Sequence, residues 1–249
     1  MFKEHPNVND PEDLTLWRYL DLFKFESILE SQGLFFAKPD ALNEVDPWEG
    51  QRGKTEIRIL GSNAMDDAAK SRENPPQNWP YISCWHKNDY ESMPMWSLYL
   101  KNPKEGVAVK TTYRRLKQCF EKIKNTIYMG EIQYVRHYDL QTTVDTRHPD
   151  PYIIYYFNKN MAFRDERELR AIVMSPKDYP EEPGIIVPGD IKVLITNIVI
   201  SPYASQEYEE MIRALVAKHG FPIEPERSDI ERQPVSALAE AAERGLKEL

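Results

Sequence analysis

The chain has 249 residues, 41% of them hydrophobic and 29% charged, a balance that fits a folded globular protein and excludes an intrinsically disordered one. Its net charge of −8 argues against broad binding to nucleic acids or membrane surfaces, which requires a basic field. No apolar run approaches the roughly 20 residues of a membrane helix, and the N-terminus lacks the apolar core of a signal peptide, so we expect a cytoplasmic protein. The two cysteines, Cys84 and Cys119, are far apart in sequence, which predicts free thiols and excludes a cysteine-based zinc site.

The N-terminal elements follow a strand–helix–strand order. Residues 1–13 are polar and contain proline, which predicts a loose lead-in. Alternating residues over 14–19 predict a strand. Asp21 fits the N-cap of a helix that Gly33 would end, and a second short strand follows at 34–37.

The middle of the chain is less regular. Residues 41–50 form a polar loop with one tryptophan, and residues 53–72 are weakly helical. Residues 74–80 are a proline-rich surface connection. Strands are then expected at 81–86, 106–111 and 127–135, with a short apolar helix at 95–100 and a longer helix at 113–124.

The remaining elements complete an α+β pattern. We expect an aromatic helix at 152–163, a strand at 163–174, a central β-branched strand at 191–200 and a helix at 207–219, ended by Gly220. The apolar face of that last helix is formed by Tyr208, Met211, Ile212 and Leu215. A last strand at 221–224 and a surface helix at 234–249 follow. This order predicts one α+β domain over 14–232, with a mixed, mostly antiparallel sheet flanked by helices.

The stretch 163–174 carries the most suggestive side chains. Six of the seven residues 164–170 are charged, and an apolar strand follows. In extended backbone Glu166, Glu168 and Arg170 share one face. Two carboxylates and a guanidinium at the start of a buried strand can hold a sugar hydroxyl or a phosphate. An ordinary network of ion pairs produces the same pattern.

Standard catalytic signatures are absent from the sequence. It contains no P-loop, no G-x-G-x-x-G, no G-x-S-x-G and no H-E-x-x-H motif. The five histidines are scattered without metal-ligand spacing, so no metal is expected. A Cys84–His86 dyad is weakly supported, because alternate strand residues share a face by default.

Several fragments occur together in a fixed order. They are Leu-Trp-Arg-Tyr (16–19), Gly-Leu-Phe-Phe (33–36), Asn-x-x-Asp-Pro-Trp-Glu-Gly (43–50), Ile-Ser-Cys-Trp (82–85), Met-Trp-Ser-x-Tyr (95–99) and Lys-x-x-x-Phe-x-x-Glu-x-Glu-x-Arg (159–170). This ordered set, closed by Ser-Asp-Ile (228–230), resembles the bacterial and phage family named domain of unknown function 2971. The resemblance adds the loop candidates Asn43, Asp46, Trp48 and Glu49. The family loop usually reads Asn-Asp-Pro-Phe-Glu, whereas here Glu44 and Val45 separate Asn43 from Asp46, which puts the family role of Asn43 in doubt.

The order of parts is also similar, more loosely, to ADP-ribosyltransferase-like folds. That resemblance implies that Arg18 holds the phosphates or ribose of NAD, that Ser83 with Trp85 or Tyr99 positions nicotinamide, and that Glu168 holds the ribose 2′-hydroxyl. The same resemblance makes Glu168 and Glu166 the catalytic candidates, with Glu166 orienting the acceptor. Trp96 and Arg170 complete the expected cofactor-binding set.

Three functions remain open at this stage. The first is an NAD-dependent ADP-ribosyltransferase-like enzyme that cleaves the nicotinamide glycosidic bond, with a protein or nucleic-acid acceptor left unspecified. The second is a non-catalytic nucleotide- or nucleic-acid-binding module, in which Arg18, Asn43, Trp48 and Trp96 form the binding face. The third is a structural or protein-interaction domain, in which Arg18 and Glu168 form a buried ion pair. Convergence of Arg18, Ser83 and Glu168 on one site would favour the enzyme.

Overall fold

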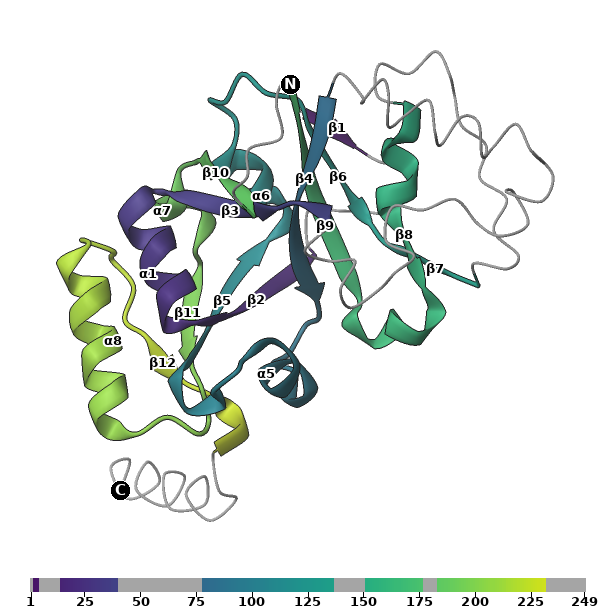
Figure 1. Cartoon of the computed structure of the whole chain (residues 1–249). Coiled ribbons are helices and arrows are strands. Elements are labelled where there is room, and N and C mark those ends of the chain that lie inside the picture. Colours follow the sequence, from purple (N-terminus) through teal and green to yellow (C-terminus); the bar gives the residue numbers. More distant parts are fainter. Residues whose placement is uncertain (1, 5–13, 40–77, 137–150, 177–182, 232–249) are drawn as a thin grey trace, which may run out of the picture.

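A mixed, mostly antiparallel sheet runs through the part of the chain that the computed structural model describes, which comprises residues 2–4, 14–39, 78–136, 151–176 and 183–231 (Figure 1). Among these residues, ten strands form the main sheet in the order β1-β6-β9-β4-β2-β5-β11-β12, and β3 pairs with both β10 and β4. The bounds of these strands are β1 Phe2–Glu4, β2 Thr15–Asp21, β3 Gly33–Ala37, β4 Asn78–Lys87, β5 Gly106–Thr112, β6 Ile127–Glu131, β9 Glu168–Pro176, β10 Gly184–Pro188, β11 Asn197–Ile200 and β12 Glu226–Arg227. The expected α+β class with a mostly antiparallel sheet is confirmed.

Helices flank this sheet, and a small second sheet lies beside it. The second sheet pairs β7, Gln133–Val135, with β8, Asn158–Asn160. The α-helices are α1 Leu22–Ser31, α5 Met93–Tyr99, α6 Tyr113–Cys119, α7 Ile191–Leu194 and α8 Gln206–Lys218. The 3₁₀ helices are η2 Pro103–Glu105, η3 Pro151–Phe157, η4 Met161–Glu166 and η5 Asp229–Glu231. None of the helices in the described ranges has the length and hydropathy needed to cross a bilayer.

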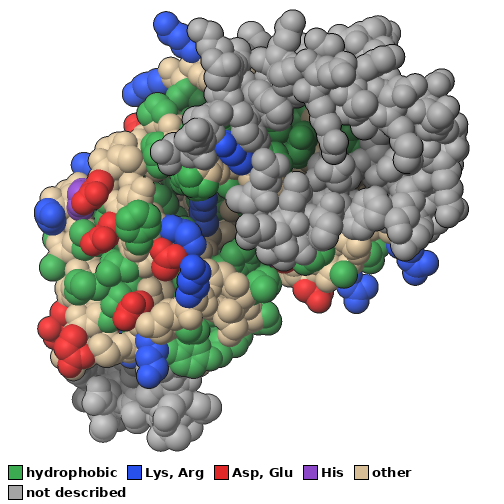
Figure 2. Space-filling view, viewed as in Figure 1, with side chains coloured by type: hydrophobic (Ala, Val, Ile, Leu, Met, Phe, Trp, Pro, Cys, Tyr) green, Lys and Arg blue, Asp and Glu red, His purple; other side chains and the backbone are tan. Residues whose placement is uncertain are grey.

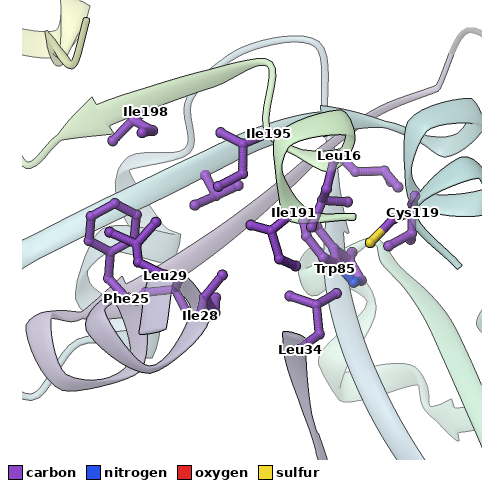
Figure 3. Close-up of a cluster of buried hydrophobic side chains, with 14 of the residues drawn as sticks. Leu16, Phe25, Ile28, Leu29, Leu34, Trp85, Cys119, Ile191, Ile195 and Ile198 are labelled. Carbon is purple, nitrogen blue, oxygen red and sulfur yellow. The ribbon is translucent and has the colours of Figure 1, made fainter. Parts of the chain in front are cut away.

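The two faces of the main sheet carry different cores. The face that we call the large-core face packs against α1, α6, α7 and α8, which Figure 1 shows gathered on one side, and Figure 3 shows side chains such as Phe25, Leu29 and Ile198 meeting there. The opposite face, the small-core face, carries one cluster under α5 around Trp96 and another under η3 around Phe157. Because strand side chains alternate between faces, each strand residue is assigned to one core.

The sheet divides where β2 and β3 both approach β4. Antiparallel pairing joins β2 to β4 only at Leu16↔Lys87 and Trp17↔His86. Farther along β4, the neighbour becomes β3, through Ala37↔Ile82. Between these two points β4 changes its partner, and we call this place the sheet split. It matters for function because Arg18, the residue after Trp17, lies there.

Helix α1 confirms one local prediction, its N-cap, and corrects another, the residue that ends it. Asp21 caps it as predicted, accepting a hydrogen bond from the Lys24 backbone N–H at 2.9 Å. Gly33 does not end it, however: Gln32 adopts the left-handed conformation with a φ of 48°, and Gly33 begins β3. A Cβ on Gly33 would lie 2.8 Å from the Val187 carbonyl oxygen, so this glycine is needed for the close approach of β10.

The β-branched run 191–200 is not a central strand, which corrects the sequence-based expectation. Residues 191–194 form the one-turn helix α7, because the Asp190 carboxylate accepts a hydrogen bond from the Val193 N–H at 3.2 Å. Only Asn197–Ile200 is extended, as β11 next to the edge strand β12. A local cap therefore outweighs the β propensity of the run.

The aromatic helix expected at 152–163 is also replaced. The chain instead forms η3, then β8, then η4. Two asparagines explain the interruption, because their amides bond to backbone groups that a continuous helix would use. Asn158 donates to the Ile154 carbonyl at 3.2 Å, and the Asn160 side chain accepts from the Ala162 N–H at 3.0 Å.

Smaller differences concern the ends and faces of elements. The helix expected to reach residue 124 ends at Cys119, whose carbonyl accepts from the Asp190 N–H. The strand 127–135 breaks at Ile132 into β6 and β7, and the last strand is β12 rather than 221–224. The lead-in contains β1, paired in parallel with β6. In α8, Met211 is 41% exposed and Val216 is buried in its place. The expected helices 53–72 and 234–249 lie outside the described residues.

Candidate functional site

The charged stretch forms a sharp corner between η4 and β9. The strand does not begin at residue 163 as expected but at Glu168, after Arg167 adopts the left-handed conformation with a φ of 43°. Three hydrogen bonds from neighbouring elements hold the backbone of this corner. His86 Nδ1 donates to the Glu166 carbonyl at 2.7 Å, the Lys87 N–H donates to the Arg167 carbonyl at 2.8 Å, and the Glu168 N–H donates to the Tyr134 hydroxyl at 2.7 Å. The corner is therefore rigid.

Lys159 of β8 links the two carboxylates. Its Nζ lies 2.6 Å from Glu166 Oε2 and 3.2 Å from Glu168 Oε2, and its side chain is only 11% exposed. Burial alone would lower the pKa of Lys159, but the charges of Glu168 and Glu166 outweigh burial and raise it above its ordinary value. Lys159 is thus a permanent cation that holds Glu166 and Glu168 together although they lie on different elements.

Glu168 is a buried and fully ionised carboxylate. Arg170 Nε donates to its Oε1 at 2.7 Å, and Arg170 Nη2 donates to its Oε2 at 3.1 Å. Burial would raise the pKa of Glu168, yet the positive charges of Arg170 and Lys159 outweigh burial and lower it to about 2. Burial, followed by the charge of Glu168, raises the pKa of the Cys84 thiol well above its ordinary value.

Tyr99 brings α5 into contact with this cluster. Its hydroxyl donates to Glu166 Oε2 at 3.1 Å, while the side chain as a whole remains 37% exposed. Burial of the hydroxyl end, followed by the charges of Glu168 and Glu166, raises the pKa of Tyr99 well above its ordinary value. Tyr99 is therefore a neutral donor with an exposed ring edge.

Arg18 occupies the sheet split. Its Nη1 donates to Ser83 Oγ at 2.9 Å and its Nη2 donates to the Phe35 carbonyl at 3.0 Å. Among the described residues, no carboxylate pairs with it. Burial lowers the pKa of Arg18 to about 10, so it remains a cation near pH 7. Cys84 and Tyr99 act on that pKa in the opposite direction from burial, but do not offset it.

The strand register assigns the predicted residues to two sides of the sheet. Cys84 and Arg170 are paired across β4 and β9, and so are His86 and Glu168, so these side chains share the small-core face. Ser83 points to the large-core face, where it bridges Arg18 and the Trp85 indole N–H, 3.2 Å away. Arg18 pairs with Val109 of β5, a large-core residue, so the side chain of Arg18 also starts on the large-core face, at the edge of the sheet split and on the opposite side of the sheet from Glu168.

The predicted tryptophans have structural positions. Trp85 is 1% exposed and Trp96 is 0% exposed, each inside a hydrophobic cluster. Arg18 Cζ lies 5.6 Å from the centroid of the Trp85 ring, and this cation–π contact helps to hold the guanidinium in place. Tyr99, at 37% exposure, is more open to a ligand than either tryptophan. The loop candidates Asn43, Asp46, Trp48 and Glu49 lie outside the described residues.

Three contributors to the cluster were not assigned roles from the sequence. Lys159 belongs to the fragment 159–170, but its spacing of seven residues from Glu166 does not indicate that the two side chains meet. Cys84 and His86 were considered only as a dyad with each other. In the structure Cys84 contacts Glu168. His86 is neutral because burial lowers its pKa, and since Nδ1 donates to a carbonyl, its buried Nε2 is an acceptor without a partner among the described residues.

Within the described ranges, no group of three His, Cys, Asp or Glu side chains is placed to hold a metal ion. Each carboxylate is instead neutralised by a side-chain cation.

On the face seen in Figure 2, acidic and basic side chains are interspersed over α1 and α8, so this surface offers no continuous basic field.

Two solved structures are similar to this chain over most of its length. Both are of DarT from Thermus sp. 2.9. One, in complex with NAD+, has a TM-score of 0.39 and 9% identity and covers 91% of this chain and 100% of its own. The other, in complex with ADP-ribosylated ssDNA, has a TM-score of 0.36 and 12% identity and covers 89% and 95%. No family model and no curated protein sequence matches the chain, so the likeness to domain of unknown function 2971 stays a resemblance. Both TM-scores are low, so these likenesses do not establish a function.

Proposed function

We propose that this protein binds NAD+ as a substrate and cleaves the bond between nicotinamide and ribose, passing ADP-ribose to an acceptor. The observation that carries the proposal is the state of Arg18. It is a half-buried guanidinium whose hydrogen bonds go to two neutral oxygens, with no carboxylate partner among the described residues. Partial burial of a cation without a counter-ion carries a desolvation cost that a bound anion would offset. The guanidinium fork suits a diphosphate, which it can bind with two parallel hydrogen bonds.

The other side of the site calls for a ligand that donates hydrogen bonds. Glu166 and Glu168 are acceptors, and the buried His86 Nε2 is an acceptor as well. A ligand with an anionic part for Arg18 and hydroxyl groups for the carboxylates satisfies both sides. A nucleotide has this combination, and the exposed edge of Tyr99 offers an aromatic surface to a base or to nicotinamide.

The chemistry of the proposed reaction is balanced without an oxidant or a metal. The C1′–N bond breaks, and its electron pair leaves with nicotinamide, whose cationic ring nitrogen becomes neutral. Positive charge then develops on the ribose C1′ and ring oxygen, where a fixed carboxylate stabilises it. The acceptor, which is water or a nucleophilic group of another molecule, adds to C1′ and gives up a proton to solvent.

The test begins with calorimetric titration of NAD+ and of ADP-ribose into four proteins: wild type, Arg18→Gln, Arg18→Lys and the control Arg115→Gln. Arg115 is an exposed arginine that, like Arg18, donates to a main-chain carbonyl, that of Val193 at 2.9 Å. Loss of a charged hydrogen bond is worth about 1.5–3 kcal/mol, so Arg18→Gln should weaken both ligands at least tenfold. Arg18→Lys keeps the charge but loses the fork and should fall between, and Arg115→Gln should bind as wild type does.

Release of nicotinamide separates an enzyme from a binding module. Chromatography of NAD+ incubated with wild type and with Arg18→Gln should detect nicotinamide from wild type alone. Binding that depends on Arg18 without any nicotinamide release would identify a non-catalytic nucleotide-binding protein. Affinity that is the same in wild type and Arg18→Gln would overturn the proposed site.

A further inference from the structure

The two carboxylates of the cluster differ in how many donors they already hold. A carboxylate has about four lone-pair positions, two on each oxygen. Glu168 accepts from Arg170 Nε on Oε1, and from Arg170 Nη2 and Lys159 Nζ on Oε2. Its side chain is 2% exposed. Both oxygens of Glu168 are therefore already occupied by cationic donors, and its burial leaves little room for a ligand hydroxyl.

Glu166 is only partly occupied. Both of its donors, Lys159 Nζ at 2.6 Å and the Tyr99 hydroxyl at 3.1 Å, bond to Oε2. Within the described residues, Oε1 has no hydrogen-bond partner. The Glu166 side chain is 11% exposed, compared with 2% for Glu168. Oε1 is thus a fixed acceptor that can still take two hydrogen bonds.

The backbone around Glu166 is built to hold this oxygen in place. The left-handed conformation of Arg167 costs a non-glycine residue about 1–2 kcal/mol, so the corner persists because its surroundings enforce it. The bonds from His86 to the Glu166 carbonyl and from Lys87 to the Arg167 carbonyl provide that enforcement. Such preorganised groups are effective at stabilising charge, since they need no reorganisation during the reaction.

We infer that Glu166, through Oε1, is the carboxylate that accepts the hydrogen bond of the ligand's ribose hydroxyl, and that Glu168 is a positioning residue. This inference rests on the proposed function and reverses the roles that the likeness to ADP-ribosyltransferase-like folds implied. Glu168 acts through Lys159 and Arg170: it fixes the ammonium that holds Glu166 Oε2, which in turn leaves Oε1 directed to the ligand. Tyr99, on the same oxygen, orients the carboxylate from the side of α5.

A thermodynamic cycle between the protein and the ligand tests this assignment. ADP-ribose and its analogue without the 2′-hydroxyl of the terminal ribose are titrated into wild type, Glu166→Gln, Glu168→Gln and the control Glu121→Gln, an exposed residue after α6. In wild type, loss of the hydroxyl should weaken binding at least tenfold, as for a charged hydrogen bond. In Glu166→Gln, removing the hydroxyl from the ligand should weaken binding less than threefold. In Glu168→Gln and Glu121→Gln, removing it should still weaken binding at least tenfold.

A kinetic readout complements the cycle. With NAD+, Glu166→Gln should lower kcat for nicotinamide release by at least a hundredfold and change KM only a few-fold, because Gln keeps an acceptor oxygen but loses the negative charge. Thermal unfolding of each variant gives the fraction folded at the assay temperature. Glu166→Gln should remain close to wild type in thermal stability, since Lys159 keeps Glu168 as its partner.

The outcomes separate the inference from the proposed function. If ADP-ribose binds and the hydroxyl effect disappears only in Glu166→Gln, the assignment holds, even where no nicotinamide is released and the proposed reaction fails. If the hydroxyl effect disappears in Glu168→Gln instead, Glu168 is the ligand-contacting carboxylate, so the inference fails while the proposed function stands. If neither NAD+ nor ADP-ribose binds wild type, both are overturned.

Discussion

Replacing Glu168 with Gln is expected to destabilise the fold in a way that depends on pH. The substitution keeps the shape of the side chain but removes the charge that Arg170 and Lys159 share. Both cations are buried, at 1% and 11% side-chain exposure, so they are left without full compensation. Removing one partner of a buried ion pair typically costs about 3–5 kcal/mol.

The pKa of Glu168 gives an independent estimate of the same quantity. A carboxyl group whose pKa falls from 4.5 to about 2 on folding contributes about 3 kcal/mol to the free energy of unfolding. The sign follows from linkage. Since the folded-state pKa lies below the unfolded one, the contribution is complete above about pH 5 and is lost as the pH falls from about 4.5 towards 2. Between pH 7 and pH 4 the loss amounts to about 1 kcal/mol.

Urea unfolding of wild type, Glu168→Gln and the control Glu121→Gln at pH 7 and pH 4 measures this effect. At pH 7 Glu168→Gln should be less stable than wild type by about 3 kcal/mol, equivalent to a fall in Tm of about 6–12 °C for a chain of this size. At pH 4 the difference should narrow by about 1 kcal/mol, and Glu121→Gln should stay within about 0.5 kcal/mol of wild type throughout. A difference below about 1 kcal/mol at pH 7, or one that does not change at pH 4, would refute the reasoning.

Three further substitutions or treatments probe the fold that supports the site. Gly33→Ala should cost about 1–3 kcal/mol in urea unfolding, because the new Cβ would lie 2.8 Å from the Val187 carbonyl oxygen; unchanged stability would contradict the close β3–β10 approach. Asp190→Ala should cost about 1 kcal/mol through loss of the α7 cap, and Asp190→Asn should retain most of it; an equal loss in both would argue against capping. Burial raises the pKa of Cys119 to about 12, and the pKa of the partly buried Cys84 also lies well above its ordinary value. Mass spectrometry should therefore find neither thiol alkylated by iodoacetamide near pH 8 in the native protein and both alkylated in denaturant; rapid native labelling would contradict the raised pKa values.

Local signals in the sequence were reliable where the cap or glycine decides the geometry. Asp21 caps α1 as predicted, and Gly220, with a φ of 66°, follows the end of α8. The α+β class follows from the order of strand and helix patterns, which depends on composition over many residues. The breaks at Asn158 and Asp190 were missed, since single polar side chains that bond to the backbone override a longer propensity signal.

The candidate site could be predicted in composition but not in arrangement. Glu166, Glu168, Arg170 and Tyr99 meet on the small-core face, with Glu166 delivered by a 3₁₀ helix rather than by the expected strand. Lys159 joins them through the β7–β8 pairing, which no local pattern indicates. The division of β4 between two partners, which leaves Arg18 at the sheet split, depends on long-range register and is invisible in a single sequence.

A crystal structure of the wild-type protein with ADP-ribose is the most direct test of the central claim that Arg18 and the carboxylate cluster form one ligand site. The account predicts the diphosphate within hydrogen-bond distance of the Arg18 guanidinium and a ribose hydroxyl within about 3.2 Å of Glu166 Oε1. Ligand density elsewhere on the protein, or a ligand that contacts neither Arg18 nor Glu166, would contradict it.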